Sequence, residues 1–268
     1  MNVLVVRAEP DDVEVCSDWL FELGATAIEE RSVQNELILV AGFTSDHAAL
    51  HARSILIERW PCRLEGTGDE ATWRDEWLKW IEPIEVAGLV IHAPWHDPAT
   101  WPGDLDSISI DPGRAFGSGH HPTTRLALTA LRNAVGPNST VLDVGFGTGI
   151  LSIAAAKLGA RAVVGIDLDY DIVEVASANA EANGVASKVE LRTEPVDGID
   201  QFDIVVANIV IGDLQPLLPA IVAASTGQIV ISGFLADQLD DLIANLNVQL
   251  VERTTLQGWS CAVLRRSA

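Results

Sequence analysis

The sequence predicts an α/β protein with a doubly wound, mostly parallel sheet, preceded by a small α+β domain. Three observations support this class. From residue 140 onward, apolar strand patterns alternate with helical patterns. A glycine-rich turn joins the first of these strands to its helix, and an acidic residue ends the next strand. The first 65 residues instead follow the order strand–helix–strand–strand–helix–strand, which is typical of a ferredoxin-like sandwich.

The small amino-terminal domain is expected to span residues 1–65. Each of its helices has a start signal, because acids precede the apolar periodicity of the first helix and Ser45 precedes that of the second. The predicted strands are 3–7, 27–31, 36–41 and 63–65, and the predicted helices are 10–23 and 45–60.

A linker helix is expected within residues 66–82. Trp73, Trp77 and Trp80 recur there at helical spacing and form one aromatic stripe. Two interpretations of the stripe stay open. It holds the helix against the domains, or it contributes to an interface with a partner.

The large domain is expected to span residues 83–268 and to open with strand-like segments up to residue 110. A glycine-rich segment at 111–124 follows and leads into a helix at 123–133. Because this segment immediately precedes the first strand of the parallel sheet, we expect it to fold over the ligand pocket as a lid.

The segment Val-Leu-Asp-Val-Gly-Phe-Gly-Thr-Gly at 141–149 predicts a strand, a tight turn and a helix start. A dinucleotide site needs G-x-G-x-x-G to cradle a pyrophosphate, whereas the spacing here is D-x-G-x-G-x-G. S-adenosylmethionine has no phosphate, and its amino-acid tail can lie on bare glycine backbone beside a carboxylate. An acid at the end of the next strand suits the two ribose hydroxyls. The candidate cofactor-binding residues of this stretch are Asp143, Gly145, Gly147, Gly149 and Asp167.

Further strands are expected at 188–192, 202–208, 228–232, 249–255 and 260–265. The last two flank the turn pair Gln257-Gly258 and are expected to form an antiparallel hairpin. A hairpin that closes a parallel sheet fits the seven-stranded class I methyltransferase variant of the Rossmann-like fold better than a six-stranded dinucleotide fold.

The apolar strand at 202–208 ends in a polar amide, Asn208. The fourth strand of such a sheet delivers its carboxyl end beside the point where ligands bind. There the carbonyl of Asn208 can accept from an amine and direct the nitrogen lone pair at a sulfonium methyl group, and positioning supplies much of the rate of such a displacement. The competing interpretation is that Asn208 only starts a turn.

The composition excludes several function classes. The formal net charge is −21, so direct binding to nucleic acid is not expected, because phosphate contact needs basic side chains. An acidic surface attracts a basic protein partner, but it also serves solubility alone. The chain start lacks a basic segment and no apolar run approaches about eighteen residues, so neither a secretion signal nor a membrane span is expected.

Cysteine and histidine spacing predicts no metal site. The three cysteines are far apart, which excludes a C-x-x-C pair and favours a reducing cytoplasm. His47 and His51 lie four residues apart, without an acid or thiol to complete a ligand set. For His120 and His121, substrate contact, a role as a base and hydrogen bonding within the loop all stay open. Nothing in the sequence demands more than a monomer.

Taken together, these motifs resemble the family of bacterial ribosomal protein L11 methyltransferases. The lid segment D-P-G-x-A-F-G-x-G-x-H-P-T-T is the most specific part of the likeness. The likeness covers nearly all of residues 72–268, and the amino-terminal domain fits in outline. The matching segments are 111–124, 141–151, 165–167, 178–184, 207–209 and 232–233.

The resemblance implies that methyl groups pass from S-adenosylmethionine to lysine side-chain and amino-terminal nitrogens of that ribosomal protein. It also implies that residues 83–268 form the catalytic domain and that the amino-terminal domain recognises the substrate. The implied cofactor contacts are Thr124, Gly145, Asp167 and Asn208. The implied lining of the methyl-transfer site is Phe116, Gly117, Ser118 and Gly119.

The chain departs from the family pattern at three places. Phe146 stands where Cys is common, His120 where Thr is common, and Val210-Ile211 where Leu-Ala is common. The last change borders the expected acceptor nitrogen. One alternative is therefore a lysine methyltransferase of the same fold that acts on a different protein. A non-catalytic cofactor-binding protein is disfavoured by the intact lid motif, and a dehydrogenase by the glycine spacing.

Overall fold

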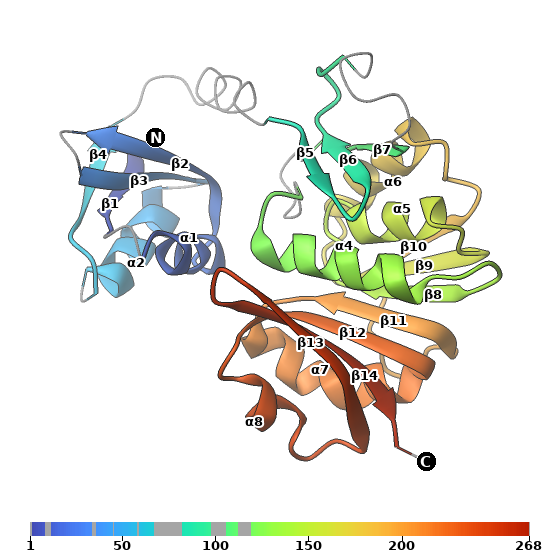
Figure 1. Cartoon of the computed structure of the whole chain (residues 1–268). Helices are drawn as coiled ribbons and strands as arrows, with labels where there is room; N and C mark the ends of the chain where they lie inside the picture. Colours follow the sequence, from blue (N-terminus) through green and yellow to red (C-terminus); the bar gives the residue numbers. More distant parts are fainter. Residues whose placement is uncertain are drawn as a thin grey trace. The chain divides into compact units, whose positions relative to one another are not determined.

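The computed structural model describes residues 2–8, 12–33, 36–44, 46–57, 59–66, 82–97, 106–111 and 119–267. The chain divides into two compact units, residues 1–81 and 82–268 (Figure 1). The linker helix predicted within 66–82 and its tryptophan stripe lie outside the described residues, apart from the first and last positions of that range.

The smaller unit is an antiparallel sheet with two helices. In chain order its elements are β1 (Asn2–Arg7), α1 (Val13–Glu22), β2 (Ala25–Val33), β3 (Glu36–Phe43), α2 (Asp46–Leu56) and β4 (Cys62–Gly66). The strand order is β2-β3-β1-β4, and each neighbouring pair is antiparallel. Leu4 and Val6 of β1 join a core with α1 and α2, whereas Val3 and Val5 belong to a separate cluster. This alternation follows from the period of two residues in a strand.

Both helices of this unit are shorter than their sequence patterns predict. The first pattern predicts a helix over 10–23, and α1 spans Val13–Glu22, with residues 9–11 outside the described part of the chain. The second pattern predicts a helix over 45–60, but α2 ends at Leu56. Beyond it, the Trp60 N–H donates to the Leu56 carbonyl (2.8 Å) in a turn. Pro61 follows, and a proline disfavours helical geometry in the residue before it.

The larger unit is built on a seven-stranded sheet. Its strands are β8 (Thr140–Val144), β9 (Ala162–Asp167), β10 (Val189–Thr193), β11 (Phe202–Asn208), β12 (Ser225–Leu235), β13 (Val248–Leu256) and β14 (Trp259–Arg266). The order is β10-β9-β8-β11-β12-β14-β13. Neighbours from β10 to β12 are parallel, and β14 is antiparallel to both β12 and β13. The strand order reverses between β8 and β11, and ligands bind such sheets at the carboxyl ends of these two strands.

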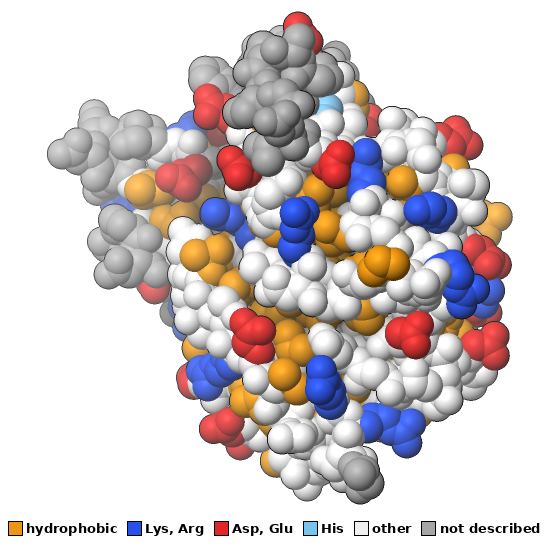
Figure 2. All heavy atoms as spheres, turned by 45° about the vertical axis from the view of Figure 1, so that its right-hand side comes forward, with side chains coloured by type: hydrophobic (Ala, Val, Ile, Leu, Met, Phe, Trp, Pro, Cys, Tyr) orange, Lys and Arg blue, Asp and Glu red, His pale blue; other side chains and the backbone are white. Residues whose placement is uncertain are grey.

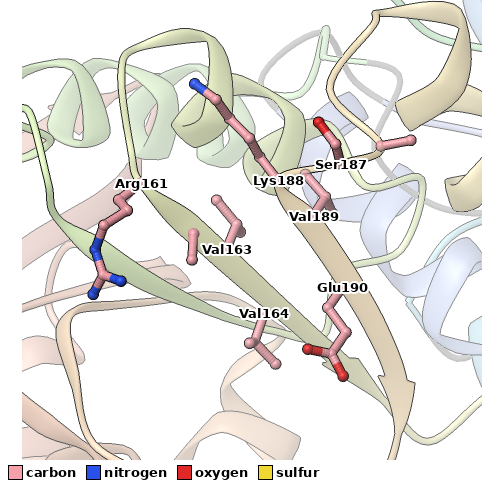
Figure 3. Close-up of a pocket in the computed structure, with 9 residues that line it drawn as sticks. Arg161, Val163, Val164, Ser187, Lys188, Val189 and Glu190 are labelled. Atoms are coloured by element: carbon pink, nitrogen blue, oxygen red, sulfur yellow. The ribbon is translucent and has the colours of Figure 1, made fainter.

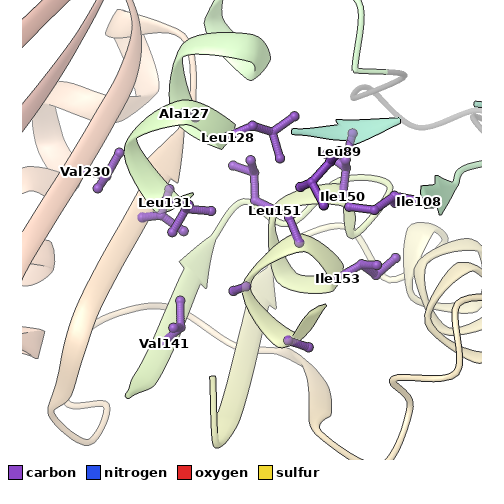
Figure 4. Close-up of a cluster of buried hydrophobic side chains, with 14 of the residues drawn as sticks. Leu89, Ile108, Ala127, Leu128, Leu131, Val141, Ile150, Leu151, Ile153 and Val230 are labelled. Atoms are coloured by element: carbon purple, nitrogen blue, oxygen red, sulfur yellow. The ribbon is translucent and has the colours of Figure 1, made fainter. Parts of the chain in front are cut away.

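Helices cover both faces of this sheet. They are α4 (Pro122–Ala134), α5 (Ile150–Lys157), α6 (Ile172–Ala182), α7 (Ile211–Ala224) and α8 (Leu239–Ile243). Val141 and Val206 join a core cluster with α4 and α5, whereas their sequence neighbours Leu142 and Val205 join a second cluster with α7 and α8. Figure 4 shows side chains of the first cluster converging from α4, α5 and the strands. Both faces are buried, which explains why these strands are apolar at successive positions.

A three-stranded sheet precedes α4 in the larger unit. Its strands are β5 (Ile84–Val86), β6 (Leu89–His92) and β7 (Asp106–Ser109), with β6 antiparallel to β5 and parallel to β7. Leu89, Ile91 and Ile108 are fully buried in the first core cluster, so this sheet packs against α4 and α5. Among the described residues, no helix is long and apolar enough to cross a membrane.

Candidate functional site

The glycine turn joins β8 to α5 at the centre of the sheet. Gly145, Gly147 and Gly149 have φ angles of 74°, 52° and 82°, a region that residues with a Cβ disfavour. The Gly145 N–H donates to the Ile166 carbonyl (2.8 Å), which ties the turn to β9. A Cβ on Gly145 would lie 3.0 Å from Ile209 Cγ1, so the chain after β11 approaches the turn closely. The turn predicted from the glycine spacing is therefore present, and its backbone carries no side chain at positions 145, 147 and 149.

Asp143 is the buried carboxylate of the site. Its side chain is 0% exposed, and its Oδ2 accepts from the Ser152 hydroxyl of α5 (2.7 Å). Its Oδ1 has no hydrogen-bond partner within the described part of the chain. Burial raises the pKa of Asp143 to about 7, although the bonds from Ser152 act in the opposite direction. A buried acceptor without a partner fits a positively charged donor such as an ammonium group.

Asp167 ends β9 and is the more exposed carboxylate of the site. Its Oδ2 accepts from the Gly147 N–H (3.3 Å), and its Oδ1 accepts from the Asp169 N–H (3.1 Å). These bonds hold the carboxylate against the glycine turn, while its remaining lone pairs can accept from a diol. Leu168 and Tyr170, which follow, are 75% and 78% exposed and provide apolar surface beside the turn.

Asn208 lies level with the glycine turn on the neighbouring strand. Ala207 pairs with Val144 of β8, so the next residues of the two strands are Asn208 and Gly145. The Asn208 Nδ2 donates to Oγ1 of the buried Thr124 in α4 (3.1 Å). This bond uses the amide nitrogen and leaves the amide carbonyl oxygen, which can only accept. Two residues that the sequence assigns to the cofactor site thus contact each other.

The chain after Asn208 is held by β12. The Ile209 N–H donates to the Ser232 carbonyl (3.2 Å), and the Ser232 hydroxyl donates to the Thr123 carbonyl (3.1 Å) at the start of α4. A Cβ on Gly233 would collide with the Ile209 carbonyl, so this position requires glycine. The Ser232-Gly233 pair therefore fixes the segment that carries Asn208 and the helix that carries Thr124.

The predicted lining of the methyl-transfer site is described only in part. Phe116, Gly117 and Ser118 lie outside the described residues. Gly119 is buried with a φ angle of 92°, and a Cβ there would lie 2.7 Å from Ile91 Cγ2. This position therefore has no room for a side chain.

The two histidines next to this segment form hydrogen bonds, one to a distant part of the chain and one within the loop. His120 Nε2 lies 2.8 Å from the Glu82 carbonyl. His121 is the N-cap of α4, where its Nδ1 accepts from the Thr123 N–H (3.3 Å). Of the interpretations that the sequence left open, the described geometry supports hydrogen bonding within the loop for His121, whereas His120 bonds to Glu82 outside it.

Several residues near the turn are not recognisable as site residues from the sequence. Ser152 orients Asp143, and Asn179 of α6 donates to the Thr148 carbonyl (3.0 Å) inside the turn. Phe146, where the family commonly has Cys, is 3% exposed and packs over β9. Its Cδ1 would lie 3.2 Å from a Cβ placed on Gly165. Of the residues that hold the turn, only Asn179 lies in a segment, 178–184, that matches the family pattern in the sequence.

A hollow of about 400 Å³ lies at a different edge of the same sheet. It is lined by the amino ends of β9 and β10, with Arg161 and Lys188 among its residues (Figure 3). The glycine turn and Asp167 follow the opposite, carboxyl ends of their strands, so this hollow is not part of the site. In the part of the chain that the structure describes, no group of three His, Cys, Asp or Glu residues is placed to hold a metal ion.

Comparison with known proteins gives the family. A family model described as "Ribosomal protein L11 methyltransferase (PrmA)" matches residues 29–267. The chain belongs to the ribosomal protein L11 methyltransferase family. The family predicted from the sequence motifs is thereby confirmed, and so is the enzyme class, an S-adenosylmethionine-dependent methyltransferase.

Individual members of the L11 methyltransferase family show the same likeness. The ribosomal protein L11 methyltransferase of Caldicellulosiruptor saccharolyticus is 37% identical over 206 residues, which cover 74% of this chain and 67% of the relative. That of Dictyoglomus thermophilum is 32% identical over 255 residues, which cover 88% of this chain and 83% of the relative. A crystal structure of ribosomal protein L11 methylase from Lactobacillus delbrueckii subsp. bulgaricus matches 70% of this chain and all of its own, with a TM-score of 0.65 and 32% identity. This likeness confirms a methyltransferase-like α/β fold with a large, mostly parallel sheet.

The residues of the site fit the cofactor of this family. Asp143 offers a buried acceptor for an ammonium group, and the glycine turn leaves backbone open to an amino-acid chain. Asp167 offers acceptors for hydroxyls at the end of β9. A pyrophosphate would instead be repelled by the two carboxylates that flank this turn.

Proposed function

We propose that this chain is a cytoplasmic S-adenosylmethionine-dependent N-methyltransferase that modifies lysine side-chain and amino-terminal amines of ribosomal protein L11. The observation that carries the proposal is the Asn208–Thr124 hydrogen bond beside the glycine turn. It leaves one amide acceptor where the carboxyl ends of β8 and β11 meet. Membership of the L11 methyltransferase family supports both the reaction and the substrate.

The cofactor would be held by residues on both sides of the turn. When bound, it supplies an electrophilic methyl group. Asp143 would pair with its ammonium group and Asp167 would accept from its ribose hydroxyls. The other residues assigned to this role are Thr124, Gly145, Gly147, Gly149 and Asn208. The strongest support for this assignment is Oδ1 of Asp143, which has no partner among the described residues, because a buried acceptor is costly without a donor.

The acceptor amine would be oriented by Asn208. An amine attacks carbon through its lone pair, so it must first give up its extra proton to water. The Asn208 carbonyl then accepts one N–H of the neutral amine and thereby fixes the direction of the lone pair. Phe116, Gly117, Ser118 and Gly119 would line the same point and exclude water from it. Positioning of this kind accounts for much of the rate in a displacement at carbon.

We also propose roles for the parts of the chain. Residues 1–65 would form a ferredoxin-like substrate-recognition domain, 66–82 a linker helix, and 83–268 a seven-stranded class I methyltransferase domain. The four-stranded antiparallel sheet with two helices supports the first assignment, and the strand order of the large sheet supports the third. The enzyme would act as a monomer without direct contact to nucleic acid or membrane.

Charge and cysteine chemistry support the partner and the compartment. The net charge of −21 attracts a basic ribosomal protein over long distances. On the face drawn in Figure 2, acidic and basic side chains are interspersed, so the attraction there comes from total charge rather than from one patch. Cys16 and Cys261 are free, and burial raises the pKa of each thiol to about 12. Neutral, buried thiols suit a reducing cytoplasm.

The test measures methyl transfer to purified L11 with isotope-labelled S-adenosylmethionine. The wild-type enzyme is expected to label L11, and Asn208→Ala is expected to lower kcat on the order of 100-fold, because one polar group that orients the reacting atom is lost. Asn245→Ala changes an exposed asparagine far along the chain and is the matched control.

Two results would contradict the proposal. Label that enters another protein of a whole-cell extract but not L11 would contradict the substrate. A wild-type rate in the Asn208→Ala enzyme would contradict the role of Asn208.

A further inference from the structure

Two asparagines one helical turn apart, Asn179 in α6 and Asn183 at its C-cap, bind the outer edge of β7 and the chain that follows it. Asn183 accepts from the Ser109 N–H through Oδ1 (2.9 Å), and its Nδ2 donates to the Ser109 carbonyl (2.6 Å). Asn179 makes the corresponding pair of bonds to Asp111. Its Oδ1 accepts from the Asp111 N–H (2.9 Å), and its Nδ2 donates to the Asp111 carbonyl (3.0 Å). In an extended chain, every second residue directs its N–H and its carbonyl toward the same edge of the strand. The two amides thus take the place of a neighbouring strand along β7, whose other edge pairs with β6.

Asn179 has a third backbone partner, and this partner belongs to the glycine turn. Its Nδ2 also donates to the carbonyl of Thr148 (3.0 Å), which lies between Gly147 and Gly149. The corresponding bond of Asn183 goes instead to the carbonyl of Asn179 in the same helix (2.8 Å). Asn179 is 3% exposed and Thr148 is fully buried, so water does not compete for these bonds. One side chain therefore joins the end of β7 to the turn.

We propose that Asn179 is a positioning residue that fixes the cofactor turn relative to the segment that supplies the methyl-transfer site. Asp111 directly precedes residues 112–119 in the chain, and Thr148 lies in the turn that would hold the cofactor. An apolar side chain of similar size would fill the same space, but only an amide can bond to both segments at once. Asn183 strengthens the hold on β7 without contact to the turn. This inference rests on the proposed function.

The test compares Asn179→Ala and Asn183→Ala with Glu181→Ala, an exposed position on the same helix. Loss of the Thr148 bond in Asn179→Ala is expected to weaken S-adenosylhomocysteine binding about tenfold and to lower kcat about tenfold, since the buried Thr148 carbonyl and both backbone groups of Asp111 lose this partner. Asn183→Ala keeps the turn intact and is expected to lower kcat a few-fold while the Kd stays within about twofold. Glu181→Ala is expected to match the wild type in both. Calorimetry gives Kd, and steady-state methyl transfer gives kcat and KM.

A merely structural role would give another pattern. Lower thermal stability in both asparagine variants, with wild-type Kd and kcat in the folded enzyme, would overturn the inference. If Asn179→Ala does not fold, amide hydrogen exchange of the wild type decides. Saturating S-adenosylhomocysteine is expected to slow exchange at Ser109 and Asp111, and unchanged exchange would overturn the inference. If the wild type binds no S-adenosylhomocysteine, the proposed function is overturned as well. If the wild type is fully active, a contrary result in the variants overturns only the inference about Asn179.

Discussion

Two carboxylates flank the same glycine turn in opposite environments. Asp143 is fully buried and keeps one oxygen without a partner among the described residues, whereas Asp167 is partly exposed and accepts two backbone N–H bonds. A buried charge is costly unless it is paired, so in the proposed site Asp143 would gain its partner when the ammonium group of the cofactor binds. Asp167 has its two backbone donors without any ligand. We infer that the buried carboxylate supplies most of the affinity and the exposed one adjusts it.

The largest effect is expected at the buried carboxylate. Asp143→Asn keeps the size of the side chain but removes its charge, so the affinity for S-adenosylhomocysteine should fall on the order of 100-fold, as for the loss of one partner of a buried charge pair. Titration calorimetry measures the change.

The matched control for this variant is Asp203→Asn in β11. Asp203 accepts from the backbone and hydroxyl of Thr140 at the opposite end of the strands and should leave the affinity unchanged. An Asp143→Asn enzyme with wild-type affinity would remove the distinction between the two carboxylates.

A smaller effect is expected at the exposed carboxylate. Asp167→Asn should weaken S-adenosylhomocysteine about tenfold, because hydrogen bonds to a partly hydrated charge contribute less than a buried pair. The same calorimetry applies, with the neighbouring exposed acid in Asp169→Asn as the control. An effect of Asp167→Asn larger than that of Asp143→Asn would reverse the comparison.

The smallest expected effect is a pH dependence that belongs to one carboxylate only. Burial raises the pKa of Asp143 to about 7, and the nearby negative charge of Asp167 acts in the same direction. Below this pH, the free enzyme carries a proton on Asp143 that must leave before an ammonium group can pair with the carboxylate. The affinity for S-adenosylhomocysteine should therefore be about fourfold lower at pH 6.5 than at pH 8. Asp143→Asn should lack this dependence, and an equal slope in both proteins would assign it to another group.

The sequence predicts those features that depend on backbone geometry close to the residue itself. The positive φ angles of the turn require glycine, and the apolar pattern of β11 stops at Asn208, so both can be recognised without a structure. The same applies to the closing hairpin, where Gln257 and Gly258 both have positive φ. The order of strands and helices in both units also follows from these local patterns.

The sequence does not predict features that depend on distant partners. Asn179 and Asp111 are 68 residues apart, and although each lies in a segment that matches the family pattern, neither segment indicates the hydrogen bonds between them. The complete burial of Asp143 depends on α5, which packs over β8 and contributes Ser152. These contacts form only once the chain is folded.

A crystal structure with bound S-adenosylhomocysteine tests the central claim most directly. We expect its amino group within hydrogen-bond distance of Asp143 Oδ1, its amino-acid chain along the glycine turn, and its ribose hydroxyls at Asp167. A ligand bound at another edge of the sheet, or with a different group at Asp143, would contradict the account.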